Sequence, residues 1–385
     1  MERDELAAWL RLLGTAGVGN ITARKLLTTF GLPQHIFAQS TAQLERHVSA
    51  RQAHALGQPA ANLAQQLDTA LSWLAAEPDQ HHLLTLADPR YPTAMLDIED
   101  PPLVLYVLGP LAQLGGNWGT GASSIAIVGS RNPTAQGAAN ARNFASAMAQ
   151  AGLTVVSGLA LGVDGAAHEG ALEGAAAGQL ATIAIVGTGL DRVYPKSHLK
   201  LAHRIAQQGL LISEYPLGTP PLAANFPQRN RIISGLTRAT LVVEAALQSG
   251  SLITARLAVE QGKDVFAIPG SIHAAQSRGC HSLIKQGAKL VESAQDILEE
   301  WPAACTPISA VTSVASCTPP PGFAGQIGLE SPLLDAIGFN PLGLDALLAR
   351  TGLDTPTLQA RLMELELEGH IARLPGGLFQ RLARC

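Results

Sequence analysis

IAIVGSRNPTAQG occupies residues 125–137 and joins a short apolar run to a glycine, a serine and an arginine. The apolar run predicts a buried strand, and Gly129 at its end lets the backbone approach a ligand closely. Ser130 and the amides of the following helix can bind a phosphate oxygen, and Arg131 supplies a bidentate charged group. The loop lacks the glycine spacing of a dinucleotide site and of a P-loop, so its neighbours must decide its ligand.

The same pattern, an apolar run that ends in small or polar residues, returns along the chain from about His82. The expected strands are LLTL, LVLYVLG, SIAIVGS, LTVVSG, TIAIVG, LLISEYP, ATLVVEA and DVFAIPG. Ala-rich amphipathic stretches such as GAANARNFASAMAQAG separate them. This alternation predicts an α/β fold, an extended Rossmann-like doubly wound parallel sheet, in residues 79–301. Ligands of such sheets bind beyond the carboxyl ends of the strands.

Residues 1–78 follow a helical pattern, because apolar side chains recur three and four positions apart. Within them, GTAGVGNITARKLL at residues 14–27 is similar to a helix-hairpin-helix, so we expect a helix-hairpin-helix or SAM-like module. The turn amides of such a hairpin can face a phosphate, although the same hairpin also serves as a packing unit. Both interpretations remain open at this point.

The C-terminal part is predicted to be a separate module. Residues 302–325 are rich in Pro, Ser and Thr without periodicity and are typical of a linker. Residues 326–385 contain three helical stretches and a hairpin around Pro375-Gly376-Gly377, which predicts a winged helix. Because Glu364, Glu366 and Glu368 crowd its third helix, a protein-contact or architectural role competes with DNA reading.

Bulk properties restrict the function classes. The 385-residue chain has 47% hydrophobic residues and a formal net charge of -4, so any nucleic-acid contact must be local. Cys280, Cys305, Cys317 and Cys385 lack the paired spacing of a zinc site and indicate free thiols in the cytoplasm. The start MERDELAAWL lacks a signal-peptide pattern, and no apolar run reaches the roughly 20 residues of a membrane helix. We therefore expect a soluble protein.

A second loop, VVSGLALGVDGAAHEGAL at residues 155–172, offers another amide-lined anion site at Ser157 and Gly158. Asp164 and His168 stand four apart on one helical face, as an acid/base pair would. The alternative is structural: Asp164 caps the helix, and His168 bonds it or a backbone carbonyl. We favour the structural interpretation, because no nucleophile or metal ligand is evident nearby in sequence.

Basic and aromatic residues then occur together twice. In IVGTGLDRVYPKSH, Tyr194 and Lys196 suit a nucleic-acid strand, since charge holds the backbone and a ring stacks on a base. In NFPQRNRIISGL, Arg229 and Arg231 flank Asn230 and suggest a phosphate site. Ion pairing of these arginines with Glu214 or Glu244 is the alternative. Ser249-Gly250-Ser251 adds another nest of amides and hydroxyls.

Six motifs now stand in order: VGSR, SGLALGVDGAAH, VYPKSH, FPQRNRIISGL, EAALQSGSLITA and GCHSLIKQGA. Through them, roughly residues 80–300 resemble the DNA-processing protein A (DprA/Smf) family. The resemblance implies a protein without turnover or cofactor that protects incoming single-stranded DNA and loads the RecA recombinase during natural transformation and recombination. It further implies a homodimer through the Rossmann-like domain and displacement of single-strand-binding protein.

Site residues follow from the motif positions, with Arg131 and Lys196 as the main phosphate contacts. Leu161 occupies a position that is sometimes basic in relatives, so one contact is lost there. The expected DNA-binding residues are Gly129, Ser130, Arg131, Ser157, Gly158, Lys196, Arg229, Asn230, Arg231, Ser249, Gly250 and Ser251.

Other function classes fit less well. Rossmann-like hydrolases that resemble phosphoribohydrolases carry a P-G-G-x-G-T loop with an Arg and a Glu, whereas Pro269 here begins PGS and the Glu is missing. A dehydrogenase would need the glycine fingerprint and its ribose-binding acid. A pure interaction scaffold predicts that replacing Arg131 leaves DNA affinity unchanged.

Overall fold

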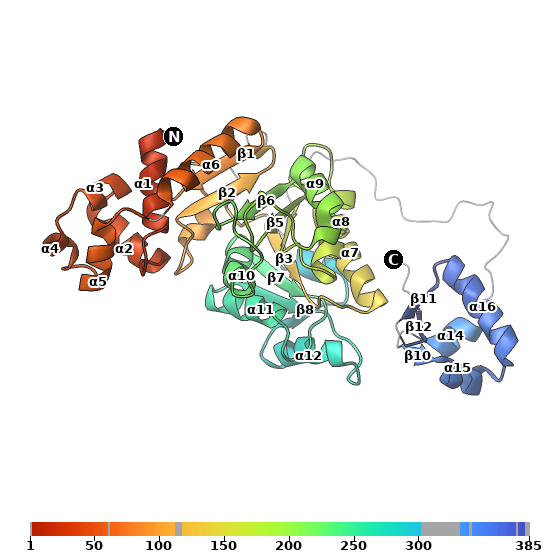
Figure 1. The fold of residues 1–385 in the computed structure, drawn as a ribbon. Coiled ribbons are helices and arrows are strands. Elements are labelled where there is room, and N and C mark those ends of the chain that lie inside the picture. The colour runs from red at the N-terminus through yellow and green to blue at the C-terminus, as the bar shows by residue number, and fades with distance from the viewer. Residues whose placement is uncertain are drawn as a thin grey trace, which may run out of the picture.

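The computed structural model describes residues 2–60, 62–111, 118–301, 332–338, 341–374 and 376–381. Figure 1 shows a helical N-terminal part, a central sheet covered by helices on both faces, and a small C-terminal unit of helices and short strands. The predicted linker, Pro375, Cys305, Cys317 and Cys385 lie outside the described residues. The predicted domain boundaries stay predictions.

The N-terminal part is helical, as the spacing of its apolar residues predicted. Leu6, Trp9 and Leu10 are buried. Two of its short helices begin with capping boxes, at Ser40 and Ser49, which satisfy backbone amides that a helix start leaves free. The helices are α1 (Arg3–Leu13), α2 (Asn20–Phe30), α3 (Pro33–Phe37), α4 (Thr41–Leu44), α5 (Ala50–Gly57) and α6 (Leu63–Ala76).

The central sheet contains all eight predicted strands and a short ninth. Its order is β1-β2-β6-β5-β4-β3-β7-β8-β9, with β3 to β9 parallel to one another. The strands are β1 (His81–Thr85), β2 (Val104–Leu108), β3 (Ser124–Val128), β4 (Thr154–Ser157), β5 (Thr182–Ile185), β6 (Leu210–Ser213), β7 (Ala239–Val242), β8 (Asp264–Ala267) and β9 (Lys289–Leu290).

One strand departs from the parallel arrangement that we predicted. β2 pairs antiparallel with both β1 and β6. A parallel pair needs a long crossover, usually a helix, whereas the β1–β2 connection carries only a 3-10 turn, η1 (Thr93–Leu96). The doubly wound arrangement therefore begins at β3.

Helices cover both faces of this sheet, which confirms the doubly wound fold. Ile125 and Ile127 of β3 pack against one layer, and Ala126 and Val128 pack against the other. The helices that follow the strands are α7 (Ala135–Gln150), α8 (Val163–Gly174), α9 (Leu199–Gln208), α10 (Asn225–Gly235), α11 (Ser251–Glu260), α12 (Arg278–Lys285) and α13 (Ala294–Leu298), with 3-10 turns η3 (Lys196–His198) and η4 (Ala275–Ser277).

The C-terminal unit has the predicted winged-helix fold. Its helices α14 (Pro332–Ile337), α15 (Leu344–Thr351) and α16 (Thr355–Leu367) pack on a three-stranded sheet of order β10-β12-β11. The strands are β10 (Leu342–Gly343), β11 (Ile371–Leu374) and β12 (Leu378–Arg381). Leu347, Leu362 and Phe379 belong to a separate apolar core, so this unit has its own packing.

Across the described ranges, no helix is both long and apolar enough to span a membrane.

Candidate functional site

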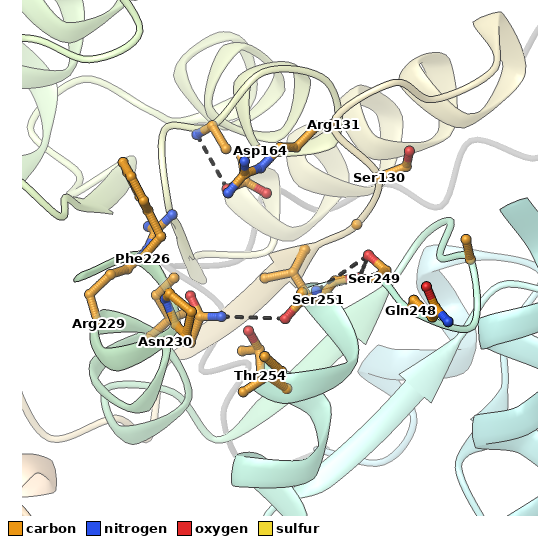
Figure 2. Close-up of a pocket in the computed structure, with 18 of the residues that line it drawn as sticks. Ser130, Arg131, Asp164, Phe226, Arg229, Asn230, Gln248, Ser249, Ser251 and Thr254 are labelled. Atoms are coloured by element: carbon orange, nitrogen blue, oxygen red, sulfur yellow. Dashed lines mark hydrogen bonds between the residues drawn. The ribbon is translucent and has the colours of Figure 1, made fainter. Parts of the chain in front are cut away.

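The strand order reverses between β3 and β7, and a pocket of about 550 Å³ opens at the carboxyl ends of these two strands (Figure 2). This is the position at which doubly wound sheets bind ligands. The loops after β3 and β7 and the first turns of α10 and α11 line the pocket. The expected residues in its lining are Gly129, Ser130, Arg131, Arg229, Asn230, Ser249, Gly250 and Ser251.

Arg131 is an exposed cation at this pocket. Its guanidinium carbon lies 5.7 Å from the centre of the Phe226 ring, and it forms no ion pair with any residue that the structure describes. Gly129 brings the loop close to its surroundings, because a side chain there would collide with Val163 and with the carbonyl of Glu244. Arg131 is therefore available to a ligand.

The helix that follows this loop already holds a carboxylate at its start, where we had predicted that its amides bind a phosphate. Glu244 accepts hydrogen bonds from the Thr134 amide (2.9 Å) and hydroxyl (2.6 Å) at the start of α7. Thr134 also caps the helix by accepting from the Gly137 amide. An internal carboxylate thus occupies the positive end of α7 that we had assigned to a phosphate.

Arg229 is a buried cation in the pocket lining, with 4% of its surface exposed. Its guanidinium packs over Gly158 and donates to the Ile185 carbonyl, whereas its Nε has no hydrogen-bond partner within the described part of the chain. Burial lowers the pKa of Arg229, and the nearby Asp164 opposes that shift without forming an ion-pair contact. The buried charge is only partly compensated.

Arg231 does not belong to the pocket, which corrects our prediction. It donates to the Glu214 carboxylate at 2.6 Å and to Asp100 at 3.0 Å. Residues two apart on a helix project in different directions, so Arg229 and Arg231 reach different sides of α10. The alternative that we kept open, pairing with Glu214, is the observed one, and Asp100 carried no signal in sequence.

Ser157 and Gly158 lie behind the pocket and outside its lining, whereas we had predicted that they face the ligand. The Ser157 hydroxyl is fully buried and donates to the Ile127 carbonyl at 2.6 Å. The Gly158 amide donates to Asp164 at 3.2 Å. Because these polar groups already have internal partners, they support the pocket instead of facing a ligand.

Asp164 is a structural carboxylate, although it does not cap α8 as we had expected. Gly162 occupies the cap position, and Asp164 accepts from the amides of Gly158 and Ala160. Burial raises the pKa of Asp164, and the Arg229 guanidinium opposes this. Asp164 therefore fixes the loop that follows β4.

His168 does not form an acid/base pair with Asp164. Its Nε2 accepts from the Leu159 amide at 3.3 Å, so Nδ1 carries the proton and donates to the Thr182 hydroxyl at 2.7 Å. Burial lowers the pKa of His168 to about 3, with repulsion from His198 and Arg229 adding to the shift. The ring is neutral and has no remaining proton-transfer partner, in keeping with the structural interpretation.

The loop after β7 forms the opposite wall of the pocket (Figure 2). The hydroxyls of Ser249 and Ser251 are 2.7 Å apart, and Asn230 donates to the Gly250 carbonyl at 3.4 Å. Gln248 and Thr254 join the same lining. Sequence reasoning left Gln248 out, because a lone polar residue beside a motif carries no signal of its own.

Lys196 lies outside the pocket lining but on its approach. It is exposed in η3, two residues after Tyr194, whose ring is 5.6 Å from Phe226. Phe226 in turn lies beneath Arg131. A pair of aromatic rings thus extends from Arg131 to the segment that carries Lys196.

Metal and thiol chemistry find no support at this site. Within the described ranges, no group of three or more His, Cys, Asp or Glu side chains is placed to hold a metal ion. Cys280 is buried behind the loop after β7, and burial raises the pKa of its thiol to about 12, so it is not a nucleophile at neutral pH.

Comparison with known proteins follows the same division of the chain. The profile of the DNA recombination-mediator protein A family matches residues 82–302, and the DprA winged helix domain profile matches residues 318–377. Protein Smf of Escherichia coli K12 is 41% identical over 320 residues, which cover 83% of this chain and 81% of that protein. DNA processing protein DprA of Streptococcus pneumoniae R6 is 45% identical over 217 residues, or 56% of this chain and 73% of that protein.

Two solved structures are similar over the fold. The crystal structure of DNA processing protein A from Streptococcus pneumoniae has a TM-score of 0.59 and 36% identity, covering 78% of this chain and 98% of that one. DNA processing protein A from Helicobacter pylori, solved to study its single-stranded DNA binding mode, has a TM-score of 0.50 and 31% identity, covering 57% of this chain and 95% of that one.

Proposed function

The chain belongs to the DNA recombination-mediator protein A (DprA/Smf) family, and from this premise we propose that it binds single-stranded DNA at the pocket between β3 and β7 and loads the RecA recombinase. The observation that carries the proposal is Arg229, a buried cation in the pocket lining without an ion-pair contact among the described residues. Buried charges are stable when they are paired, so an anionic ligand is the missing partner. A DNA phosphate has the required charge and size.

The surface beside the pocket supports a strand with unpaired bases. Arg131 and Lys196 supply charge for phosphates, and the Phe226 ring beneath Arg131 lies 5.6 Å from the ring of Tyr194, two residues before Lys196. Tyr194 is 48% exposed and accessible to a base. Stacking on such rings requires bases that are free of a duplex, which favours single-stranded over double-stranded DNA.

The contact is local, as the net charge of -4 requires. Phosphate contacts position a strand without reading its sequence, so we expect weak base preference at this pocket. The predicted role in natural transformation and recombination, with protection of incoming DNA in the cytoplasm, follows from the family.

A homodimer through the Rossmann-like domain completes the proposal. β9 is the edge of the sheet and leaves Leu290 44% exposed, and Ile272 in the loop that follows the neighbouring strand β8 is 74% exposed. An open strand edge with apolar neighbours favours pairing with a second copy. The dimer would present the strand to RecA, which displaces single-strand-binding protein.

We propose binding without turnover as opposed to nucleotide hydrolysis. A hydrolase needs a titratable group at its reacting centre. His168 is neutral and enclosed, and Asp164 is held by two amides. Ser271 stands where a phosphoribohydrolase-like loop would continue with glycine.

The test is fluorescence anisotropy with a labelled oligonucleotide, single-stranded and as a duplex, across a salt series. We expect salt-sensitive, strand-selective binding by the wild type, and a loss of at least tenfold in the Arg131→Glu, Lys196→Glu double variant. Arg51→Glu with Arg204→Glu changes the net charge equally at exposed positions outside the pocket lining and serves as the control. Equal affinity of wild type and the pocket variant would reject the proposal.

A further inference from the structure

A second pocket of about 320 Å³ lies where α6 of the N-terminal part meets the loop that follows β6. Asn62, Gln65 and Gln66 line it from the helix side, and Tyr106 lines it from β2. Residues 216–219 form the remaining wall. None of its lining residues is charged.

Polar groups in this pocket have unused hydrogen-bonding capacity. Tyr106 is only 1% exposed, yet its hydroxyl forms no hydrogen bond with any residue that the structure describes. Burial raises the pKa of Tyr106, so the hydroxyl stays protonated and available as a donor. The side chains of Asn62 and Gln65 are exposed and that of Gln66 is half-buried, and their amides bond to none of the described residues, so they are open to solvent or to a ligand. Tyr106 is otherwise buried and lines the pocket, so its hydroxyl is available to a ligand that enters there.

The chemistry of these groups selects the ligand. Each amide offers a donor and an acceptor, and the phenol offers a donor. Amide side chains pair with the donor and acceptor edges of nucleobases, which single strands expose. Without a cation in the lining the pocket does not suit a phosphate, and without a carboxylate it does not suit a metal ion.

The two pockets lie along one edge of the sheet. The loop after β6 contributes residues 216–219 to the second pocket, and the start of α10 contributes Phe226 to the first. The loop after β5 joins them, because Gly189 donates to the Thr219 carbonyl at 3.1 Å and Asn225 donates to the Gly187 carbonyl at 3.0 Å. The seven Cα–Cα steps from Thr219 to Phe226 span at most about 25 Å, so one strand of several nucleotides can reach both pockets.

We infer that the second pocket binds one unstacked nucleobase of the strand whose phosphates occupy the first pocket. The inference rests on the proposed function and deepens it, since it assigns a base-binding role to the interface between the N-terminal helices and the sheet. The Tyr106 hydroxyl and the Gln65 and Gln66 amides would make the base contacts.

The experiment compares oligothymidylates of about 2 and about 20 nucleotides, of which only the longer is long enough to occupy both pockets at once. Tyr106→Phe and the Gln65→Ala, Gln66→Ala pair are the test variants. The control is the Gln207→Ala, Gln208→Ala pair, two adjacent exposed glutamines on α9. We expect both test variants to bind the long strand about five- to tenfold more weakly than the wild type, and to bind the short strand with unchanged affinity. The control should bind both like the wild type.

Further arms separate the alternatives. If both test variants bind the long strand like the wild type while Arg131→Glu loses binding, the inference is overturned and the proposed function stands. Wild-type affinity of Arg131→Glu for both strands would overturn the proposed function and the inference with it. If the wild type binds free thymidine, and Tyr106→Phe abolishes that binding without changing the affinity for the long strand, the pocket binds a free nucleoside. This result would overturn the inference that it holds a base of the bound strand. Thermal melting of each variant verifies its fold.

Discussion

At the residue scale, two arginines two positions apart on α10 have different partners and different roles. Arg229 is buried at the pocket without a full partner, whereas Arg231 is held by Glu214 and Asp100. The sequence predicted both as phosphate contacts, because the RNR pattern does not tell which side of a helix meets a carboxylate. Arg131 was predicted correctly as a pocket residue, since it directly follows a strand at the carboxyl edge of the sheet.

Replacing each arginine with the neutral methionine distinguishes the ligand-binding role from the structural one. Arg229→Met removes a partly compensated buried charge, one bond to a carbonyl and the cation that offsets the burial of Asp164. Because Asp164 keeps its two amide bonds, we expect the free energy of unfolding to fall by less than about 2 kcal/mol. Its affinity for single-stranded DNA should fall at least tenfold. Arg231→Met leaves two carboxylates without their partner and should destabilise the fold by about 3 kcal/mol without changing the affinity of the folded protein. Urea denaturation measures the stability of each variant, and anisotropy measures its affinity for single-stranded DNA. A large loss of stability in Arg229→Met together with a loss of affinity in Arg231→Met would refute the assignment.

His168 makes the stability of the protein depend on pH. Its folded pKa of about 3 is depressed below the unfolded value of about 6.5, so the unfolded state binds the extra proton first. Stability is therefore complete above pH 6.5 and falls as the pH drops toward 3. Between pH 7 and pH 5 we expect a loss of about 2 kcal/mol from this group.

His168→Gln checks this dependence by urea denaturation at several pH values. The variant should be less stable than wild type at pH 7, because it loses the bonds to Leu159 and Thr182. The difference should shrink by about 2 kcal/mol at pH 5. A difference that stays constant with pH would show that His168 is protonated in the folded state.

At the element scale, the sequence predicted the strands better than their directions. All eight apolar runs form strands, because short β-rich runs bounded by glycine or proline have few alternatives. β9 was missed, since two exposed residues carry no periodicity. The antiparallel β2 was missed because direction depends on the connection and not on the strand itself. The contact between Glu244 and the start of α7 was missed for a similar reason. It joins residues 110 positions apart, which no local pattern encodes.

The contact between α7 and α8 depends on glycines. A methyl group on Gly170 would collide with the Arg142 carbonyl, and one on Gly174 would collide with the Ser146 carbonyl. Because main-chain atoms cannot yield cheaply, Gly170→Ala should destabilise the protein by about 1–3 kcal/mol. Gly57→Ala is the matched control, since Gly57 is also helical and nothing lies near its position. Equal stability of the two variants in urea would contradict this close packing.

At the scale of the whole molecule, the N-terminal helices are attached to the sheet by specific polar contacts. Arg24 of α2 donates to the carbonyls of Leu96 and Ile98, and the start of α6 closes the second pocket. The sequence predicted a helical module here but gave no sign of this attachment, which joins residues more than 70 positions apart. The winged helix has a core of its own and exposes Glu364, Glu366 and Glu368, so phosphate contact is expected at the sheet and not there.

The central claim is that the strand binds at the carboxyl ends of β3 and β7, and hydrogen exchange with and without an oligothymidylate of about 20 nucleotides tests it most directly. We predict slower exchange in residues 129–132, 226–230 and 248–252 for the wild type with the single strand, and little change with a duplex or in Arg131→Glu. Protection confined to residues 3–57 or 332–381 would place the strand on a terminal module and contradict the account.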